Sequence, residues 1–74
     1  MTYLVIIEKA NNNWSAYVPD LPGCVAAGRT RLITYQNIQK AINMHITGLR
    51  EDGIPVPYPS AKAAYVKRQK AAAN

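Results

Sequence analysis

The sequence is short of the residues that several kinds of site require. It holds one cysteine, Cys24, and one histidine, His45, which excludes an internal disulfide and a zinc cluster built from these two residue types. No apolar run approaches the roughly 18 residues that a membrane span needs, and the first residues lack the basic region and cleavage site of a signal peptide. We therefore expect a cytoplasmic protein with no metal, no cofactor and no membrane contact.

Acidic residues are also scarce. A two-metal nuclease needs several converging carboxylates that hold cations about 3.5–4 Å apart. The chain has only four acidic residues, two of them at the end of a predicted helix and one in a proline-bound turn: Glu8, Asp20, Glu51 and Asp52. No nucleophile or orienting acid is placed beside His45, and Cys24 is expected to be a small core residue. We therefore expect no catalytic residue, and a protein that is not an enzyme.

Positive charge is in excess and unevenly spread. The net charge is +5, yet residues 1–61 carry five basic and four acidic side chains. The remaining basic residues, with no acid among them, are Lys62, Lys67, Arg68 and Lys70. We interpret residues 67–74 as a basic, flexible tail and residues 1–66 as the folded domain. The alternative is attraction of this tail to nucleic acid or an acidic partner.

A chain of 74 residues makes one domain with a thin core. At this size folding buries only about 60–65% of the surface that the unfolded chain exposes. Association of copies is the usual remedy, so we expect a homo-oligomer, a dimer or higher.

The first third of the chain predicts three short strands. Residues 3–8 are apolar and β-branched, and Asn11-Asn12-Asn13 marks a hairpin loop, because asparagine tolerates positive φ. In the next strand Trp14, Ala16 and Val18 share one face. Residues 19–23, with two prolines and a glycine, form a rigid connection to a third strand over 24–27 that Gly28 closes.

A helix over about residues 31–52 follows. Thr30 is the candidate N-cap, and Gly53 stands where a C′ glycine belongs, with Ile54 positioned to pack on Leu49. The residues that recur at three- and four-residue steps, and so predict the buried face, are Tyr35, Ile38, Ile42, Ile46 and Leu49.

Alternating prolines at 55, 57 and 59 predict an extended connector, after which residues 63–67 read as a short fourth strand. A right-handed crossover would return this strand parallel to the first. The sequence thus predicts an α+β fold of the order β-β-β-α-β: three antiparallel strands, one helix packed on the sheet and a short parallel fourth strand.

The block of residues 17–24, Tyr-Val-Pro-Asp-Leu-Pro-Gly-Cys, resembles the signature of the HicB family of bacterial type II antitoxins. The resemblance extends over about residues 1–66 and includes the first strand, Gly28 and Thr30 before the helix, and Glu51-Asp52-Gly53-Ile54-Pro55 after it. One departure is that Leu32 and Ile33 occupy first-turn positions that are usually acidic in the family.

The resemblance implies a partial ribonuclease-H-like fold and a partner, a HicA-type messenger-RNA-cleaving toxin that this domain neutralises by protein–protein contact. Many members carry a second, DNA-binding domain; with 74 residues we expect none here, and no operator binding by that route.

Two sets of residues are candidate binding sites. Ile33 and Met44 are 11 residues apart, so they project within about 20° of each other and away from the apolar stripe; we expect them to contact a partner. Arg29 and Arg31 flank the cap Thr30, where free N–H groups and two cations predict an anion site. A nucleic-acid-associated protein using these arginines and the basic tail is the alternative function, less favoured than the antitoxin.

Overall fold

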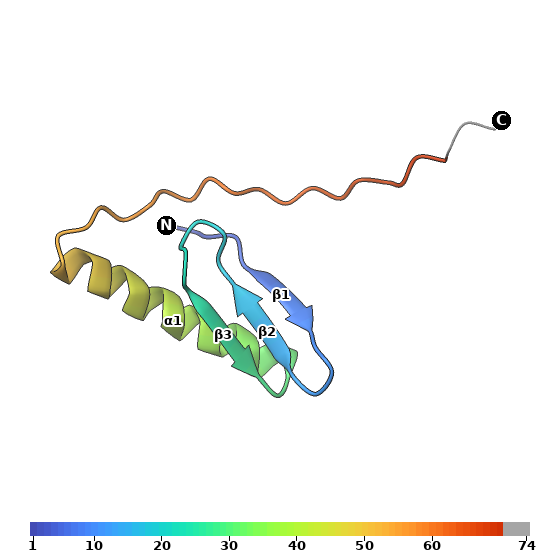
Figure 1. Cartoon of the computed structure of the whole chain (residues 1–74), viewed down its shortest axis with the longest axis horizontal. Helices are drawn as coiled ribbons and strands as arrows, with labels where there is room; N and C mark the ends of the chain where they lie inside the picture. Colours follow the sequence, from blue (N-terminus) through green and yellow to red (C-terminus); the bar gives the residue numbers. More distant parts are fainter. Residues whose placement is uncertain (71–74) are drawn as a thin grey trace.

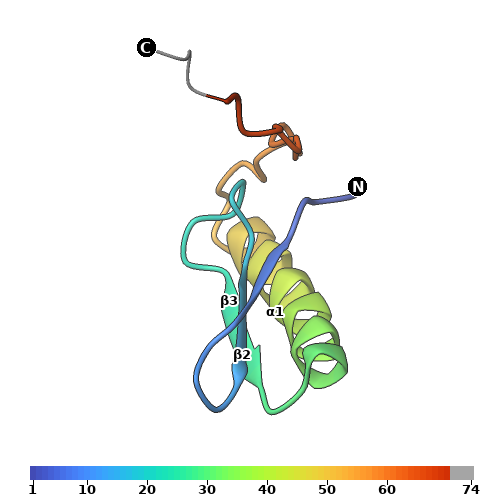
Figure 2. The ribbon, with the colours of Figure 1, turned by 90° about the vertical axis from the view of Figure 1, so that its right-hand side faces the viewer.

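The computed structural model describes residues 1–70 as three strands and one helix, in the order β1 (Ile6–Lys9), β2 (Trp14–Tyr17), β3 (Val25–Gly28) and α1 (Arg31–Glu51). The strands form one antiparallel sheet with the order β1-β2-β3 (Figure 1). Figure 2 shows two layers, with α1 packed across one face of the sheet. The α+β class with three antiparallel strands and one packed helix is confirmed.

β1 and β2 form the hairpin that the asparagine-rich turn predicts, with Ile7 opposite Ala16. The loop closes through a hydrogen bond from the Ala10 N–H to the Asn13 carbonyl, 2.8 Å long. The expectation of positive φ at the asparagines is wrong, since within the described residues only glycines adopt it. The four-residue loop over 10–13 reverses the chain without the left-handed conformation that a two-residue turn requires.

The connection from β2 to β3 is a compact turn. The N–H groups of Leu21 and Cys24 donate to the carbonyls of Val18 and Leu21, both at 3.0 Å. Gly23 has a φ of +83°, the conformation for which glycine was expected there. The turn places the side chain of Leu21 fully inside the core.

The helix begins and ends as its sequence predicts. The Thr30 hydroxyl accepts a hydrogen bond from the Ile33 N–H at 3.0 Å, which is the N-cap contact. At the other end Gly53 has a φ of +68°, and the N–H groups of Gly53 and Ile54 donate to the carbonyls of Arg50 and Leu49. This pair of bonds is the Schellman motif.

The core lies between α1 and the inner face of the sheet. The predicted faces of β2 are confirmed, with Ala16 and Val18 buried and Trp14 half-buried. The helix contributes Ile38, while Ile42 and Ile46 pack at the margin. The fully buried apolar residues are few: Ala16, Val18, Leu21, Cys24 and Ile38.

One helix residue was placed wrongly. Tyr35 was expected on the buried stripe, but 47% of it is exposed, and Thr34 is fully buried in its place. The Thr34 hydroxyl donates to the Thr30 carbonyl at 2.8 Å, so its polar group is satisfied inside the helix. The Thr34 side chain packs closely against Gly28, where an added Cβ would stand 2.7 Å from the Thr34 Oγ1.

The predicted fourth strand is absent from the described chain. Residues 63–67 are extended but pair with no strand. Two hydrogen-bonded contacts fix the chain after the helix against the body. Within the proline segment the Tyr3 hydroxyl donates to the Pro57 carbonyl at 2.6 Å, and just after it Asp20 binds Ser60 and Ala61. Beyond this point the chain leaves the sheet instead of following β1 (Figure 1), so the pairing cannot form within one copy in this conformation.

The proposed boundary between a domain at 1–66 and a basic tail at 67–74 stays a prediction, and residues 71–74 lie outside the described residues. Within residues 1–70, no helix combines the length and the apolar character that crossing a membrane requires.

Candidate functional site

The side of α1 that borders β3 carries the exposed apolar residues singled out from the sequence. Ile33 lies beside Gly28, at the end of β3, and Met44 lines a groove with Val25, at its start. Their exposed fractions are 41% and 75%. Eleven residues of helix separate them by about 16 Å along the axis, so they mark the two ends of one surface rather than one compact cluster.

β3 is an edge strand, because its only neighbour in the described sheet is β2. Between Ile33 and Met44 the Asn37 amide donates to the Ala27 carbonyl at 2.8 Å. This bond fixes the helix against the strand. We call the edge of β3, together with the exposed side chains on either side of it (Val25, Ile33 and Met44), the β3 flank.

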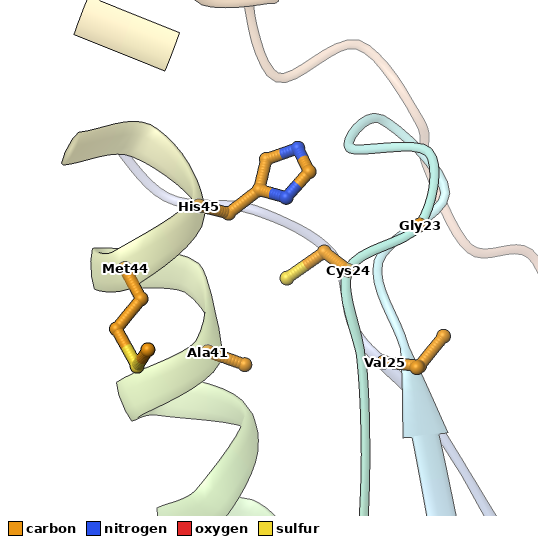
Figure 3. A pocket seen from close by; sticks show the side chains of 6 residues that line it. All are labelled: Gly23, Cys24, Val25, Ala41, Met44 and His45. Carbon is orange, nitrogen blue, oxygen red and sulfur yellow. The ribbon is translucent and has the colours of Figure 1, made fainter. Parts of the chain in front are cut away.

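A groove of about 320 Å³ opens on the β3 flank between the strand and the helix, lined by Gly23, Cys24, Val25, Ala41, Met44 and His45. In Figure 3 the Cys24 sulfur points toward the helix, and the His45 ring reaches over from α1 toward the loop that carries Gly23. Val25 points away from the helix, onto the other face of the sheet. On the sheet side, the side chain that faces the groove is therefore that of Cys24, just before β3, while Val25 contributes to the lining next to the strand edge.

The two side chains of this groove that could react, Cys24 and His45, are not arranged as a nucleophile and its base. Cys24 is 3% exposed, and burial raises the pKa of its thiol, which keeps it protonated and poorly nucleophilic. The Cys24 thiol and the His45 ring share no hydrogen bond within the described residues. The core position expected of Cys24 is confirmed.

The acidic residues do not gather. In the part of the chain that the structure describes, no three side chains of the kinds that bind metals come together. Glu8 is exposed on β1, while Glu51 and Asp52 lie at the end of α1. Asp20 has a structural role: Oδ2 accepts from the N–H groups of Ser60 and Ala61 at 2.8 and 2.9 Å, and Oδ1 accepts from the Ser60 hydroxyl at 2.9 Å.

The three residues of the candidate anion site lie next to one another at the start of the helix. Arg29, Thr30 and Arg31 are exposed at the start of α1. The Thr30 hydroxyl is engaged by the Ile33 N–H, and Arg31 borders residues of β1. Anion binding at these residues stays a prediction.

The basic side chains near the C-terminus are exposed. Lys62, Lys67, Arg68 and Lys70 all belong to the extended segment that leaves the body. Sequence reasoning identified this charge but missed two features: the Asp20 contact, which joins residues 40 and 41 positions apart, and the exposure of Val25. Alternation between buried Cys24 and half-buried Ala26 was the available signal for Val25.

Comparisons with known proteins agree on a family. Residues 3–73 match the family described as HicB-like antitoxin of bacterial toxin-antitoxin system. Among curated proteins, the chain is 37% identical over 68 residues to an uncharacterized 14.9 kDa protein of Haemophilus phage HP1, covering 92% of this chain and 51% of the phage protein. It is 38% identical over 47 residues to a UPF0150 protein of Helicobacter pylori, covering 64% of this chain and 65% of that protein.

A UPF0150 protein of Thermoplasma acidophilum is 35% identical over 63 residues, which is 84% of this chain and 91% of that protein. The chain thus spans about half the length of the phage relative and most of the archaeal one. Among solved structures, a chain of the HicA3 and HicB3 toxin-antitoxin complex matches with a TM-score of 0.70 and 33% identity, covering 81% of this chain and 70% of that one.

Proposed function

Because this chain belongs to the HicB-like antitoxins of bacterial toxin–antitoxin systems, we propose that it neutralises a HicA-type toxin by binding it through the β3 flank. The observation that carries the proposal is the likeness, in both sequence and fold, to a chain of a solved toxin–antitoxin complex. The role is that of a binding protein, which acts by covering the toxin and performs no catalytic step.

The β3 flank supports this role because it combines two modes of recognition. β3 is an edge strand, and apart from the Ala27 carbonyl, which accepts from Asn37, the backbone groups on its outer side are open to a partner strand in the described sheet. Exposed apolar side chains lie on both sides of that edge: Met44, 75% accessible, on the helix side beside the groove, and Val25, 65% accessible, on the other face of the sheet. Buried apolar residues near the centre of an interface supply most of its affinity.

The test replaces Met44 by glutamate and measures binding to the HicA-type protein encoded in the same genome. We expect the Met44→Glu variant to bind at least about ten-fold more weakly, a loss of about 1.4 kcal/mol. The fold should remain, since a substitution at an exposed site changes stability by less than about 0.5 kcal/mol. Calorimetry gives the affinity and circular dichroism the fold.

Gln39→Glu is the matched control. It makes the same change of charge at an exposed position of the same helix, but Gln39 borders β1 residues on the opposite flank. It should bind the toxin as the unmodified chain does. Equal weakening by both variants, or by neither, would contradict the placement of the toxin on the β3 flank.

The nucleic-acid alternative rests on Arg29, Arg31 and the basic residues of the C-terminal segment, all of them exposed. Phosphate contacts release counterions, so such binding weakens steeply as salt rises. Replacing Lys67, Arg68 and Lys70 by glutamine should leave toxin binding nearly unchanged. If toxin binding is lost in that variant and kept in Met44→Glu, the placement of the toxin on the β3 flank is wrong. The nucleic-acid alternative is supported only if the chain also binds nucleic acid in a shift assay, with an affinity that falls in the same variant and with rising salt.

A further inference from the structure

β1 forms the second free edge of the sheet. Its only neighbour is β2, so the backbone groups on its outer side pair with nothing in the described sheet. Apolar, half-buried residues lead into this edge and form its first half, from Leu4 to Ile7, while Glu8 and Lys9 in its second half are exposed. A free edge with apolar residues is a template for another strand.

The chain itself holds a segment suited to that edge. Residues 62–70, the C-terminal arm, are extended and fully exposed. Tyr65 and Val66 have exposed fractions of 103% and 87%, and both residue types favour strands. Seven extended residues reach about 23 Å, which exceeds the length of β1.

The arm begins beside β1 and then departs from it. The Asp20 carboxylate holds Ser60 and Ala61 at the end of β2, next to the start of β1. Ala63 and Tyr65 border a groove of about 300 Å³ that they share with residues 4–7 and Arg31. Figure 1 shows that the chain then continues past the sheet and away from the direction of β1.

The overall dimensions show how far the arm extends. The radius of gyration is 16.0 Å, against about 11 Å for a compact chain of this length. The molecule measures 59 × 30 × 17 Å, and in Figure 1 its longest axis follows the C-terminal segment. A second molecule is therefore within reach of the arm.

We propose that residues 62–68 of one copy pair with the free edge of β1 in a second copy, and that the exchange is reciprocal. Each sheet then gains its fourth strand from its partner. Every copy has one arm and one β1 edge, so a two-fold dimer uses both and leaves no arm for further growth. The exchange covers Tyr65 and Val66, and it supplements a core of only five buried apolar residues.

The first experiment compares Val66→Pro with Val66→Thr by sedimentation velocity at about 10 μM. Proline has no N–H and disrupts strand pairing, whereas threonine is β-branched and keeps its N–H. We expect the unmodified chain and Val66→Thr to sediment as dimers of twice 8.2 kDa. Val66→Pro should dimerise at least ten-fold more weakly, with an unchanged circular dichroism spectrum, because Val66 lies outside the packed body.

The second experiment identifies which copy supplies the strand. One protein carries Glu8→Cys and another Lys67→Cys, both with Cys24→Ala, and the two are mixed, unfolded, refolded and oxidised. A disulfide that joins one chain of each kind supports the exchange. A chain carrying both cysteines should likewise form a linked dimer.

Several results would overturn the proposal. A disulfide within the doubly substituted monomer would show that the arm folds back on its own sheet. A monomeric unmodified chain, a dimer that survives Val66→Pro, or equal loss of the dimer in both Val66 variants would each exclude strand exchange. The proposal does not depend on toxin binding, since that is assigned to the opposite edge of the sheet.

Discussion

At the scale of single residues, Asp20 connects two parts of the chain that are 40 residues apart in the sequence. Its carboxylate accepts three hydrogen bonds from Ser60 and Ala61 and so joins the turn after β2 to the segment after the prolines. The N–H groups of Ala61 and then Ser60 are the main cause of a lowered pKa for Asp20. The charged form is therefore the one that holds the segment.

The lowered pKa gives a pH dependence with a definite sign. In the unfolded chain Asp20 titrates near the ordinary value of about 4, above its pKa in the fold. The contact therefore stabilises the fold above that pH and is lost as the pH falls through the lower, folded value. Amide shifts of Ser60 and Ala61 in NMR should follow a midpoint below about 4. Asp20→Ala, which removes the acceptor oxygens, should release both amides at all pH values; a midpoint above the ordinary value would contradict the assignment.

Gly28 is a second residue whose identity the packing fixes. An added Cβ would stand 2.7–2.9 Å from atoms of Thr34 and Ile33, one of them backbone. Gly28→Ala should therefore destabilise the protein by about 1–3 kcal/mol in urea unfolding, as overpacking does. Gly48→Ala is the control, because it has open space within α1 and should stabilise the helix by up to about 1 kcal/mol. Changes of the same sign in the two variants would be inconsistent with this packing.

At the scale of elements, the helix ends were predictable because their signals are local. Thr30 and Gly53 each act through bonds to residues at most four positions away. The buried face was predicted less well, since the spacing of apolar residues does not show that the polar Thr34 packs against Gly28 and is fully buried while Tyr35, the next residue along the helix, is exposed. The Asp20 contact had no local signal, because its partners lie 40 and 41 residues away.

The cap gives a prediction for the helix as a unit. Thr30→Ala removes the acceptor of the Ile33 N–H, and should lower the free energy of unfolding by about 1 kcal/mol. Thr47→Ala removes a similar hydroxyl from an exposed position inside α1, and should leave stability equal or slightly higher, since alanine favours the helix. Thermal unfolding followed at 222 nm compares the two. A larger loss at position 47 would mean that the cap does not hold the start of α1.

At the scale of the whole molecule, the described sheet has two free edges, β1 and β3, and different parts of the chain lie beside each of them. The edge of β3 lies beside the groove and the exposed side chains of α1, whereas the edge of β1 lies beside the start of the C-terminal arm. The candidate residues Ile33 and Met44 were found from helical spacing alone, because the spacing of two residues determines whether their side chains point to the same side of the helix. The edge beside them could not be found that way, since strand order is a property of the assembled sheet.

The two contacts that hold the chain after the helix also determine how it would carry a mechanical load. A pull on the C-terminal arm reaches the Asp20 carboxylate first, where three hydrogen bonds act in parallel. Only after these yield does tension pass back to the bond between Tyr3 and Pro57, and then to the Schellman motif at the end of α1. We therefore expect the anchor at Asp20 to yield to a pull on the arm before the strands separate.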